Sequence, residues 1–387
     1  MDLTEEYSGT VAYKGNTLKI PLFLDNQSTT PVAPEVQEII TSVLSVPGNA
    51  ASRTHVFGLQ AKRKIEAARE RVAALINAHP DEIFFTSGAT ESNRIALQEF
   101  ASSQNRKGQI ISLMTEHNSV LSPLAKLKNE GHDVTLLPVQ KNGLLDIKTL
   151  EKALSSDTIL VSIQAANSEI GTCQDIPQIA SLCHSRNIPF HTDAVQGVGT
   201  QPIDTSKSEI TLLSLSAHKL YGPQGIGALY VSRESRFKPA VETGTPPTAL
   251  IAGFGEACRL AIQKRNEDSR HIAIMSEQFI RILEDKLGQD IWINGHRELR
   301  NPGCLSIGFK NIDVEDFLLN MPSLALSTGS ACNSASNAPS TVLRALGLSA
   351  IDANSVLRIG LGRYVTEIEA DYAANLLVKT YSDLRRQ

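Results

Sequence analysis

One lysine of this sequence, Lys219, stands between an apolar run and a glycine-containing turn. Leucine and serine alternate with a period of two from Leu213 to Ser216, which predicts a strand, and the turn at Gly222 ends it. The end of this strand therefore presents His218 and Lys219 beside a tight turn. A lysine in such a place can form a Schiff base with a carbonyl cofactor, which is the usual way an enzyme holds pyridoxal phosphate.

A second short strand lies upstream and ends in a carboxylate, Asp193, with the amide Gln196 shortly after it. Pyridoxal phosphate needs a carboxylate that keeps its pyridine nitrogen protonated, so that the ring can act as an electron sink. An isolated lysine is most often a solvated surface residue, and an isolated Asp193 would be typical of a turn or a helix cap. The two strand ends together favour a pyridoxal phosphate site.

Further stretches of the sequence strengthen this interpretation. In chain order they are LDNQSTTPV, TSGATESN, ANSEIGTCQDI, HTDAVQ, SLSAHKLYGPQGIGALYV and STGSACNSAS. Together they resemble the fold-type I, class V aminotransferase superfamily and, within it, the cysteine desulfurases of the NifS and IscS type. The resemblance runs from about Leu24 to the C-terminus, and several independent motifs in the right order make it specific.

The order of predicted elements indicates an α/β fold. Strands alternate with helices over most of the chain, which predicts a mainly parallel sheet covered by helices, with the functional residues at strand ends. The pattern changes after about Ile262. We therefore expect a large cofactor-binding α/β domain at residues 25–262 and a smaller α+β domain from residues 1–24 and 263–387. Helices are predicted at residues 34–44, 60–76, 272–287 and 367–384, and a hairpin turn at residues 14–16.

Composition excludes several classes of protein. The 387 residues are 41% hydrophobic and 20% charged, as expected of a globular protein. A net charge of −4 without a basic block argues against nucleic-acid binding. The acidic start is unlike a signal peptide, and no apolar run is long enough to cross a membrane. Five scattered cysteines without a C-x-x-C pair predict neither a metal site nor a disulfide framework, and they fit a reducing cytoplasm.

The resemblance assigns roles in cofactor binding. Lys219 becomes the Schiff-base lysine, Asp193 the partner of the pyridine nitrogen, and Gln196 and Asn167 the donors to the phenolic oxygen. His117 stacks on the ring and moves protons, which its pKa range suits. Each amide, considered alone, is more typical of a buried group that satisfies backbone, and a lone histidine is more often structural. The resemblance places these residues around the phosphate: Ala89, Thr90, Ser216, His218 and, from the partner subunit of a homodimer, Thr245.

The same resemblance assigns the residues that act on the substrate. Arg358 grips the carboxylate of L-cysteine, a bidentate task that suits a guanidinium group, and Asn167 helps to hold it. Cys332 lies among small residues in an exposed loop, although a free cysteine normally prefers the core, which suggests reactivity. In the family this cysteine takes the substrate sulfur as a persulfide, leaves alanine as the other product, and passes the sulfur to a protein acceptor.

The chain departs from the family after Tyr230 and Val231. Family members carry a glycine-rich segment and an arginine there that are missing here, although Gly244 and Thr245 remain. A partner-dependent subunit or scaffold with little activity of its own is therefore one alternative, and a selenocysteine lyase is another. The sequence does not distinguish iron–sulfur cluster assembly, tRNA thiolation and DNA phosphorothioation as the destination of the sulfur.

Overall fold

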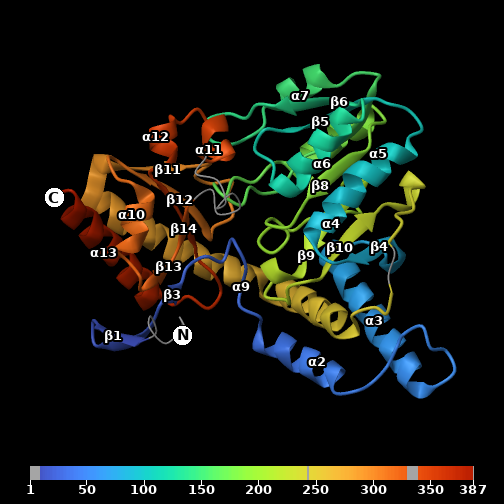
Figure 1. Cartoon of the computed structure of the whole chain (residues 1–387), viewed down its shortest axis with the longest axis horizontal. Coiled ribbons are helices and arrows are strands. Elements are labelled where there is room, and N and C mark those ends of the chain that lie inside the picture. Colours follow the sequence, from blue (N-terminus) through green and yellow to red (C-terminus); the bar gives the residue numbers. More distant parts are fainter. Residues whose placement is uncertain (1–8, 242–243, 329–338, 387) are drawn as a thin grey trace.

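Two parts of the chain, each with its own sheet, are joined by one long helix (Figure 1). The computed structural model describes residues 9–241, 244–328 and 339–386. In Figure 1 the larger part lies to the right and the smaller part, with the C-terminus, to the left. Helix α9 (Thr248–Leu287) runs between them.

The larger part is built on a seven-stranded sheet with the order β4-β10-β9-β8-β7-β5-β6. All neighbouring pairs are parallel except the two that β10 makes. The bounds of the strands are β4 Ile83–Thr86, β5 Gln109–Leu113, β6 Asp133–Leu137, β7 Thr158–Ser162, β8 Phe190–Asp193, β9 Leu212–Ser216 and β10 Gly227–Val231. The prediction of a mainly parallel sheet is thereby confirmed.

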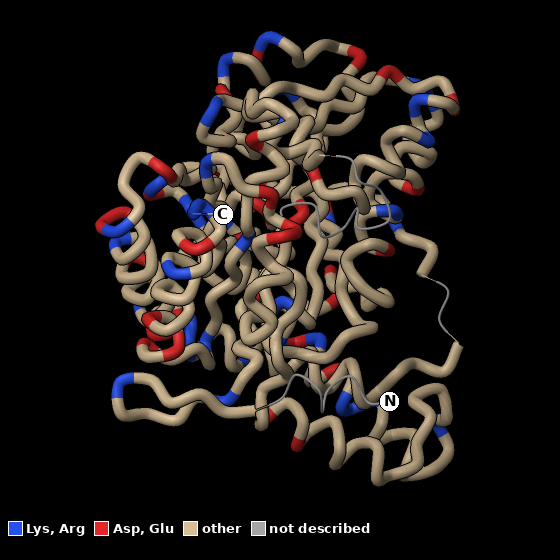
Figure 2. The backbone as a smooth tube through the Cα atoms, turned by 60° about the vertical axis from the view of Figure 1, so that its left-hand side comes forward, with Lys and Arg blue, Asp and Glu red and all other residues tan. Residues whose placement is uncertain are grey.

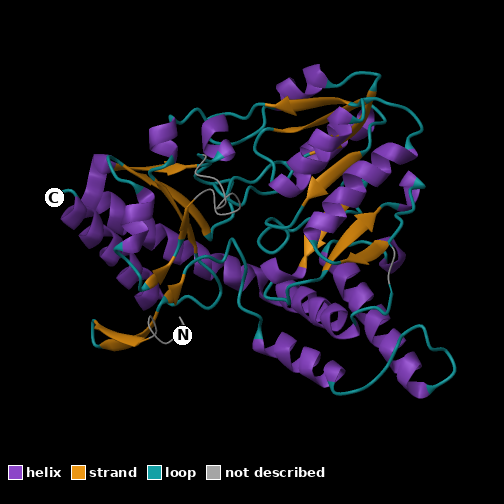
Figure 3. Cartoon of the chain, in the orientation of Figure 1, coloured by secondary structure: helices purple, strands orange, loops and turns teal. Residues whose placement is uncertain are grey.

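Helices flank the strands of this sheet (Figure 3). Strands β7 and β10 are buried along their whole length, which is why their sequences are nearly continuous apolar runs. Strand β9 is buried along its whole length as well, although its leucines alternate with serines. The remaining helices of this part are α2 Pro34–Leu44, α3 Val56–Leu75, α4 Ala89–Arg94, α5 Phe100–Ser103, α6 Asn118–Asn129, α7 Ile147–Ala153 and α8 Ile176–Ser185. A π-helical turn at 95–99 joins α4 to α5, so that the chain stays helical from Ala89 to Ser103.

The smaller part has a four-stranded antiparallel sheet with the order β11-β12-β15-β14. Its core includes Phe309, Phe317 and Tyr381, whose rings meet at 5.0–6.5 Å between centroids. The elements are β11 Ile291–Asn294, β12 Cys304–Phe309, α10 Val314–Leu319, β13 Leu324–Ala325, β14 Ser327–Thr328, α11 Thr341–Ala345, α12 Ala350–Ala353, β15 Val356–Gly360 and α13 Glu367–Leu384.

The N-terminal segment packs against this smaller part. The predicted hairpin forms between β1 (Gly9–Tyr13) and β2 (Asn16–Ile20), with Lys14 and Gly15 at φ of 48° and 78° in its turn. Asp371 of α13 accepts hydrogen bonds of 2.7 Å from Tyr13 and Lys14. Strand β3 (Leu22–Phe23) pairs in parallel with β13. These contacts bring the first strands beside the last helix.

Most predicted helices are confirmed, with two shifted starts. Helices α2 and α13 have the predicted bounds. Helix α3 begins four residues early because the His55 side chain accepts a hydrogen bond from Gly58 N and caps it. Helix α9 begins at Thr248 rather than Ile272, because its first turns are buried on all sides and show no amphipathic period.

Charged residues are spread over both parts of the chain, with basic and acidic positions interspersed (Figure 2). Within the described ranges, no helix combines the length and the apolar character that a membrane span requires.

Candidate active site

Lys219 lies where the chain leaves the carboxyl end of β9. The strand ends at Ser216, and a 3₁₀ turn (Ala217–Lys219) follows it before the turn at Gly222. The Lys219 ammonium donates to the backbone carbonyls of Gln27 and Ser28, the latter at 2.6 Å. These acceptors are 192 and 191 residues away in sequence, so tertiary structure holds the lysine in place.

Asp193 ends β8, the neighbour of β9, and faces Ser214 in the register of the two strands. Its carboxylate is 8% exposed and accepts from Asn93 Nδ2 at 2.8 Å and from Val195 N at 3.1 Å. Both donors are neutral. No cation among the described residues forms an ion pair with this carboxyl group, so its local partners are dipoles only.

A chain of hydrogen bonds connects Asp193 to His117. Asn93 Nδ2 also donates to Ser119 Oγ at 2.9 Å, and Ser119 Oγ lies 2.8 Å from His117 Nδ1. Because the backbone N–H of Ser119 also donates to Nδ1 at 3.1 Å, the neutral ring carries its hydrogen on Nε2. His117 is in addition the N-cap of α6. The position and tautomer of this histidine are therefore fixed by its neighbours.

Nine of the predicted residues line one cavity of about 520 Å³, a volume typical of small-molecule sites. The cavity lies at the carboxyl ends of the parallel strands, where open α/β sheets bind ligands. The predicted residues that line it are Ala89, Thr90, His117, Asp193, Gln196, Ser216, His218, Lys219 and Arg358. A larger groove of about 670 Å³ lies near Pro189 and Thr211, at the start of β8 and β9, and none of the predicted residues lines it.

One wall of the cavity presents backbone N–H groups. Gly88 precedes α4 with φ of 151°, a conformation that favours glycine, and Ala89 and Thr90 form the first helical turn. Opposite them, burial and then the charge of Lys219 lower the pKa of His218 to about 4. His218 is therefore neutral near pH 7 and acts through hydrogen bonds, such as the one between its Nδ1 and Thr29 Oγ1 at 3.1 Å.

Arg358 extends from β15 of the smaller part into this cavity. It is 3% exposed, and its guanidinium donates to Asp25 Oδ1 at 2.9 Å, to Ser28 Oγ at 2.6 Å and to Ser168 O at 3.4 Å. Its Nε is buried and has no hydrogen-bond partner among the described residues. The arginine is thus ordered yet retains donor capacity for an incoming carboxylate.

A buried carboxyl group, Glu116, precedes His117 in sequence and contacts Gln164, which lines the cavity. Its Oε1 accepts from Gln164 N at 2.8 Å, and its Oε2 has no partner in the part of the chain that the structure describes. Burial, and secondarily the charge of Asp193, raises the pKa of Glu116 well above its usual range. Burial therefore favours the neutral form of this carboxyl group.

Three predicted residues are not found at the cavity wall. Asn167 is buried behind it: its Oδ1 accepts from Glu169 N and Ile170 N, and its Nδ2 donates to Thr115 O at 2.9 Å. Thr245 is exposed, and its hydroxyl lies 3.3 Å from Asn49 Nδ2. Cys332 lies outside the described residues.

Sequence reasoning missed several residues that hold the site together. They are Asp25, Gln27, Ser28, Asn93 and Ser119, all of which contact a predicted residue. Asp25 to Ser28 and Asn93 belong to two of the stretches that carry the family resemblance. That membership was the only available signal, because none of these residues stands out by its chemistry alone.

Comparison with known proteins gives a consistent result. The family described as aminotransferase class-V matches residues 22–241 and 236–372. The cysteine desulfurase of Homo sapiens is 42% identical over 378 residues, which cover 94% of this chain and 82% of that protein. The cysteine desulfurase IscS of Neisseria meningitidis is 44% identical over 382 residues, which cover 95% of this chain and 94% of that protein.

Two solved structures share the fold over nearly the whole chain. A NifS-like protein superimposes with a TM-score of 0.87 at 32% identity, covering 93% of this chain and 99% of that one. A structure described as SspA in complex with cysteine superimposes with a TM-score of 0.80 at 34% identity, covering 89% and 99%.

Proposed function

The chain belongs to the class V aminotransferase family, and from this premise we propose that it is a pyridoxal phosphate-dependent cysteine desulfurase. It converts L-cysteine to L-alanine, and Cys332 takes the sulfur as a persulfide for transfer to a protein acceptor. The observation that carries the proposal is the single cavity in which Lys219, Asp193, His117 and Arg358 meet. A cofactor-binding lysine and a carboxylate-binding arginine in one cavity suit an amino-acid substrate.

The residues around the cavity fit this cofactor. The buried Asp193 carboxylate has only neutral partners in the described part of the chain, and a protonated pyridine nitrogen would supply the missing cation. Lys219 Nζ provides the point of covalent attachment, and Gln196 lines the wall beside it. When bound, the cofactor supplies an electron sink for carbanion chemistry at the substrate. Its phosphate would be held by the first turn of α4 and by Ser216 and His218.

The residues of this chain then have separate tasks. Arg358 binds and orients the carboxylate of L-cysteine, Lys219 moves the proton at Cα, and His117 Nε2 assists proton transfer. The Cβ–S bond of the substrate breaks, and Cys332 Sγ, as the thiolate, forms the new S–S bond. The Cβ atom takes up a proton, and the carbon skeleton leaves as alanine.

Asn167 contributes chiefly by shaping the site. It holds the Thr115 carbonyl and the turn at residues 167–170, which leaves one hydrogen of Nδ2 for the contacts with cofactor and substrate that the resemblance implies. We retain those contacts as part of the proposal.

We further propose that the protein acts as a homodimer. Several large apolar side chains are exposed around the end of α2 and the start of α3: Leu44, Val46, Val56, Phe57 and Leu59. A groove of about 260 Å³ is lined by Leu44, Val46 and Phe57 and continues to Pro246 and Pro247, directly after Thr245. Exposed apolar patches of this kind mark contact surfaces. A second subunit seated there would place Thr245 at the interface, in line with its proposed role at the partner's phosphate.

The cellular compartment follows from the cysteines. Four of them, Cys173, Cys183, Cys258 and Cys304, are buried free thiols. We propose a reducing, cytoplasmic location for the reaction.

The first experiment is an absorbance spectrum of the purified protein with pyridoxal phosphate, followed by addition of L-cysteine. We expect a near-visible band that shifts with cysteine, and formation of alanine and sulfide. Lys219→Ala should lose the covalent band. Absence of any band in the wild type would contradict the assignment of Lys219.

Further outcomes separate the alternatives. A stable band without alanine formation would favour the partner-dependent subunit that the missing glycine-rich segment suggests. A large preference for selenocysteine over cysteine would favour a lyase. Cys332→Ala should keep the band and lose sulfur transfer, whereas Cys183→Ala, a buried thiol on α8, serves as the matched control. Retained desulfuration in Cys332→Ala would refute the persulfide role.

A further inference from the structure

One short segment, from Leu24 to Ser28, contacts both functional cations of the cavity. Its backbone carbonyls at Gln27 and Ser28 accept from the Lys219 ammonium. Its side chains at Asp25 and Ser28 accept from the Arg358 guanidinium. Lys219 belongs to the larger part and Arg358 to the smaller, so this segment connects the two groups that must act on one substrate.

The segment is itself fixed on strand β15. Asp25 forms a parallel bridge with Gly360, Gly360 N donates to Leu24 O at 2.6 Å, and Asn26 Nδ2 donates to Gly360 O at 2.8 Å. A side chain at Gly362 would overlap the Asn26 amide. Close backbone approach therefore sets the position of Asp25 relative to Arg358.

Within this segment Asp25 is the only carboxylate that reaches Arg358. Its side chain is 19% exposed, and the arginine side chain is 4% exposed. Asp25 Oδ1 also accepts from Ser327 Oγ at 2.9 Å, and Ser327 is the cross-strand partner of Arg358 in β14. One oxygen thus holds both the arginine and the neighbouring strand.

We propose that Asp25 is a positioning residue that orients the Arg358 guanidinium for the α-carboxylate of the substrate. It neutralises a cation that would otherwise be buried without a counter-charge, and it occupies one side of the guanidinium so that the remaining donors face the ligand. The inference rests on the proposed function, since it assumes an amino-acid substrate.

The test compares ligands that differ by the carboxylate alone. L-cysteine and cysteamine are titrated into the pyridoxal phosphate-loaded dimer, with the cofactor absorbance as the readout, for wild type, Asp25→Asn and Asp25→Ala. We expect Asp25→Ala to raise the half-saturating concentration of L-cysteine by about 10-fold or more, because a misplaced guanidinium loses a charge-assisted bidentate contact. Asp25→Asn keeps an acceptor oxygen, so its half-saturating concentration of L-cysteine should lie between those of the wild type and Asp25→Ala. The half-saturating concentration of cysteamine should change by less than about twofold in either variant, because cysteamine has no carboxylate to contact Arg358.

Asp268→Asn is the matched control. This variant removes the carboxylate charge from a second aspartate–arginine pair, Asp268 with Arg363, which does not contact Arg358. It should leave the ratio of cysteine to cysteamine affinity unchanged. The proposal would be overturned if Asp25→Ala lost equal affinity for L-cysteine and for cysteamine. It would also be overturned if Asp268→Asn changed the ratio of the two affinities as much as Asp25→Ala does.

A crystal structure of Asp25→Ala keeps the inference testable on its own. We expect the guanidinium of Arg358 to leave its place beside Ser28 and Ser168. An unchanged arginine would overturn the role of Asp25, whatever the activity. Conversely, a wild type whose cofactor band responds to neither amine would count against the proposed function, while this structure would still decide whether Asp25 positions Arg358.

Discussion

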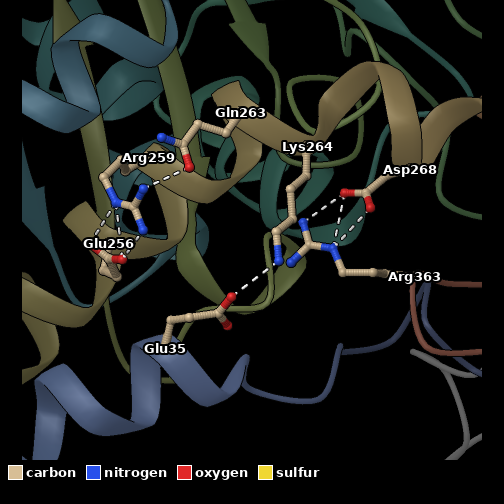
Figure 4. Close-up of polar contacts among 7 residues, drawn as sticks. All are labelled: Glu35, Glu256, Arg259, Gln263, Lys264, Asp268 and Arg363. Atoms are coloured by element: carbon tan, nitrogen blue, oxygen red, sulfur yellow. Dashed lines mark hydrogen bonds and ion pairs between the residues drawn. The ribbon is translucent and has the colours of Figure 1, made fainter.

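Two buried arginines lie five residues apart, and they are arranged in opposite ways. Arg363 makes three hydrogen bonds of 2.7–3.1 Å to both oxygens of Asp268 (Figure 4). Its guanidinium also lies 4.1 Å from the centre of the Tyr221 ring. Arg358 shares a single oxygen of Asp25 and otherwise contacts a hydroxyl and a carbonyl at the edge of the cavity.

The difference separates closed polar clusters from open ones. In a closed cluster, such as Arg363 with Asp268, both carboxylate oxygens bind the guanidinium and match its charge inside the protein. Arg363 Nη1 also has no hydrogen-bond partner among the described residues, but this arginine does not line the cavity of the candidate site, so the arrangement serves stability. In an open cluster, such as Arg358 with Asp25, part of the hydrogen-bonding capacity remains for a ligand. His191 is a second closed case, because Ser162 and Ser214 hydroxyls lie 2.8 and 3.1 Å from its two ring nitrogens. Glu116 also keeps an acceptor, Oε2, without a hydrogen-bond partner among the described residues, although it does not line the cavity.

Removing the acid from each pair should show the largest contrast. Asp268→Ala leaves Arg363 buried and uncompensated, so we expect a loss of about 3–5 kcal/mol in the free energy of unfolding. Asp25→Ala should cost less, roughly 1–3 kcal/mol, since Arg358 lines the cavity and its released guanidinium can turn into that space. Urea denaturation of the holoenzyme measures both. Glu284→Ala, which breaks an exposed pair with Arg297, is the control. Equal losses of unfolding free energy in Asp268→Ala and Asp25→Ala would contradict the distinction between closed and open clusters.

Replacing each arginine by lysine tests the same contrast through function. Arg358→Lys should raise the KM for L-cysteine about 10- to 100-fold, because an ammonium group lacks the bidentate geometry. Arg363→Lys should change KM by less than about twofold and instead lower the free energy of unfolding by roughly 1–3 kcal/mol. Steady-state kinetics and urea denaturation of both variants provide the measurements. A KM increase in Arg363→Lys as large as that in Arg358→Lys would contradict the assignment.

The closed cluster at His191 predicts sensitivity to acid. Burial lowers the pKa of His191 to about 3, so below pH 6.5 the unfolded chain binds a proton that the folded chain does not. Stability should therefore fall as the pH drops, by about 2 kcal/mol between pH 7 and pH 5 from this group alone. His191→Asn should flatten that slope, whereas His184→Asn, at an exposed position on α8, should leave it unchanged. An unaltered slope in His191→Asn would argue against a neutral buried ring.

The buried carboxyl group of Glu116 predicts an effect of opposite sign. Because burial raises its pKa, the folded state is favoured at low pH, and this advantage is lost as the pH rises. Glu116→Gln keeps the acceptor for Gln164 N and should therefore stabilise the protein more at pH 8 than at pH 5. Thermal unfolding at both pH values, with Glu91→Gln at the cavity rim as the comparison, measures the difference. If the stability difference between Glu116→Gln and the wild type were the same at pH 5 and pH 8, Glu116 would be ionised at both pH values.

The sequence predicted the fold where periodicity and burial agree. Helix α2 and helix α13 have one apolar face each, and their bounds were predicted correctly. The first turns of α9 contain Gly253, Gly255 and the buried Glu256, whose carboxylate pairs with Arg71 and Arg259. They lack an exposed polar face that would reveal the helical period. Burial on all sides, a tertiary property, therefore concealed the start of that helix.

The site was predictable for residues whose chemistry is distinctive, and less so for those that support them. The sequence motifs contain ionisable side chains that the structure brings to one cavity, among them Lys219, Asp193 and Arg358. Asp25 and Asn93 act through contacts across 333 and 100 residues of sequence, which no local pattern encodes.

Helix α9 has a practical consequence for anyone who wishes to divide this protein. It is 40 residues long, about 60 Å, and it places side chains in the cores of both parts. The predicted domain boundary at residue 262 falls inside it rather than in a linker. Constructing two independently expressed fragments by cutting there would expose two apolar helix halves, and each fragment would aggregate or reassociate with the other. A split reporter or a circular permutant of this chain must have its new ends elsewhere.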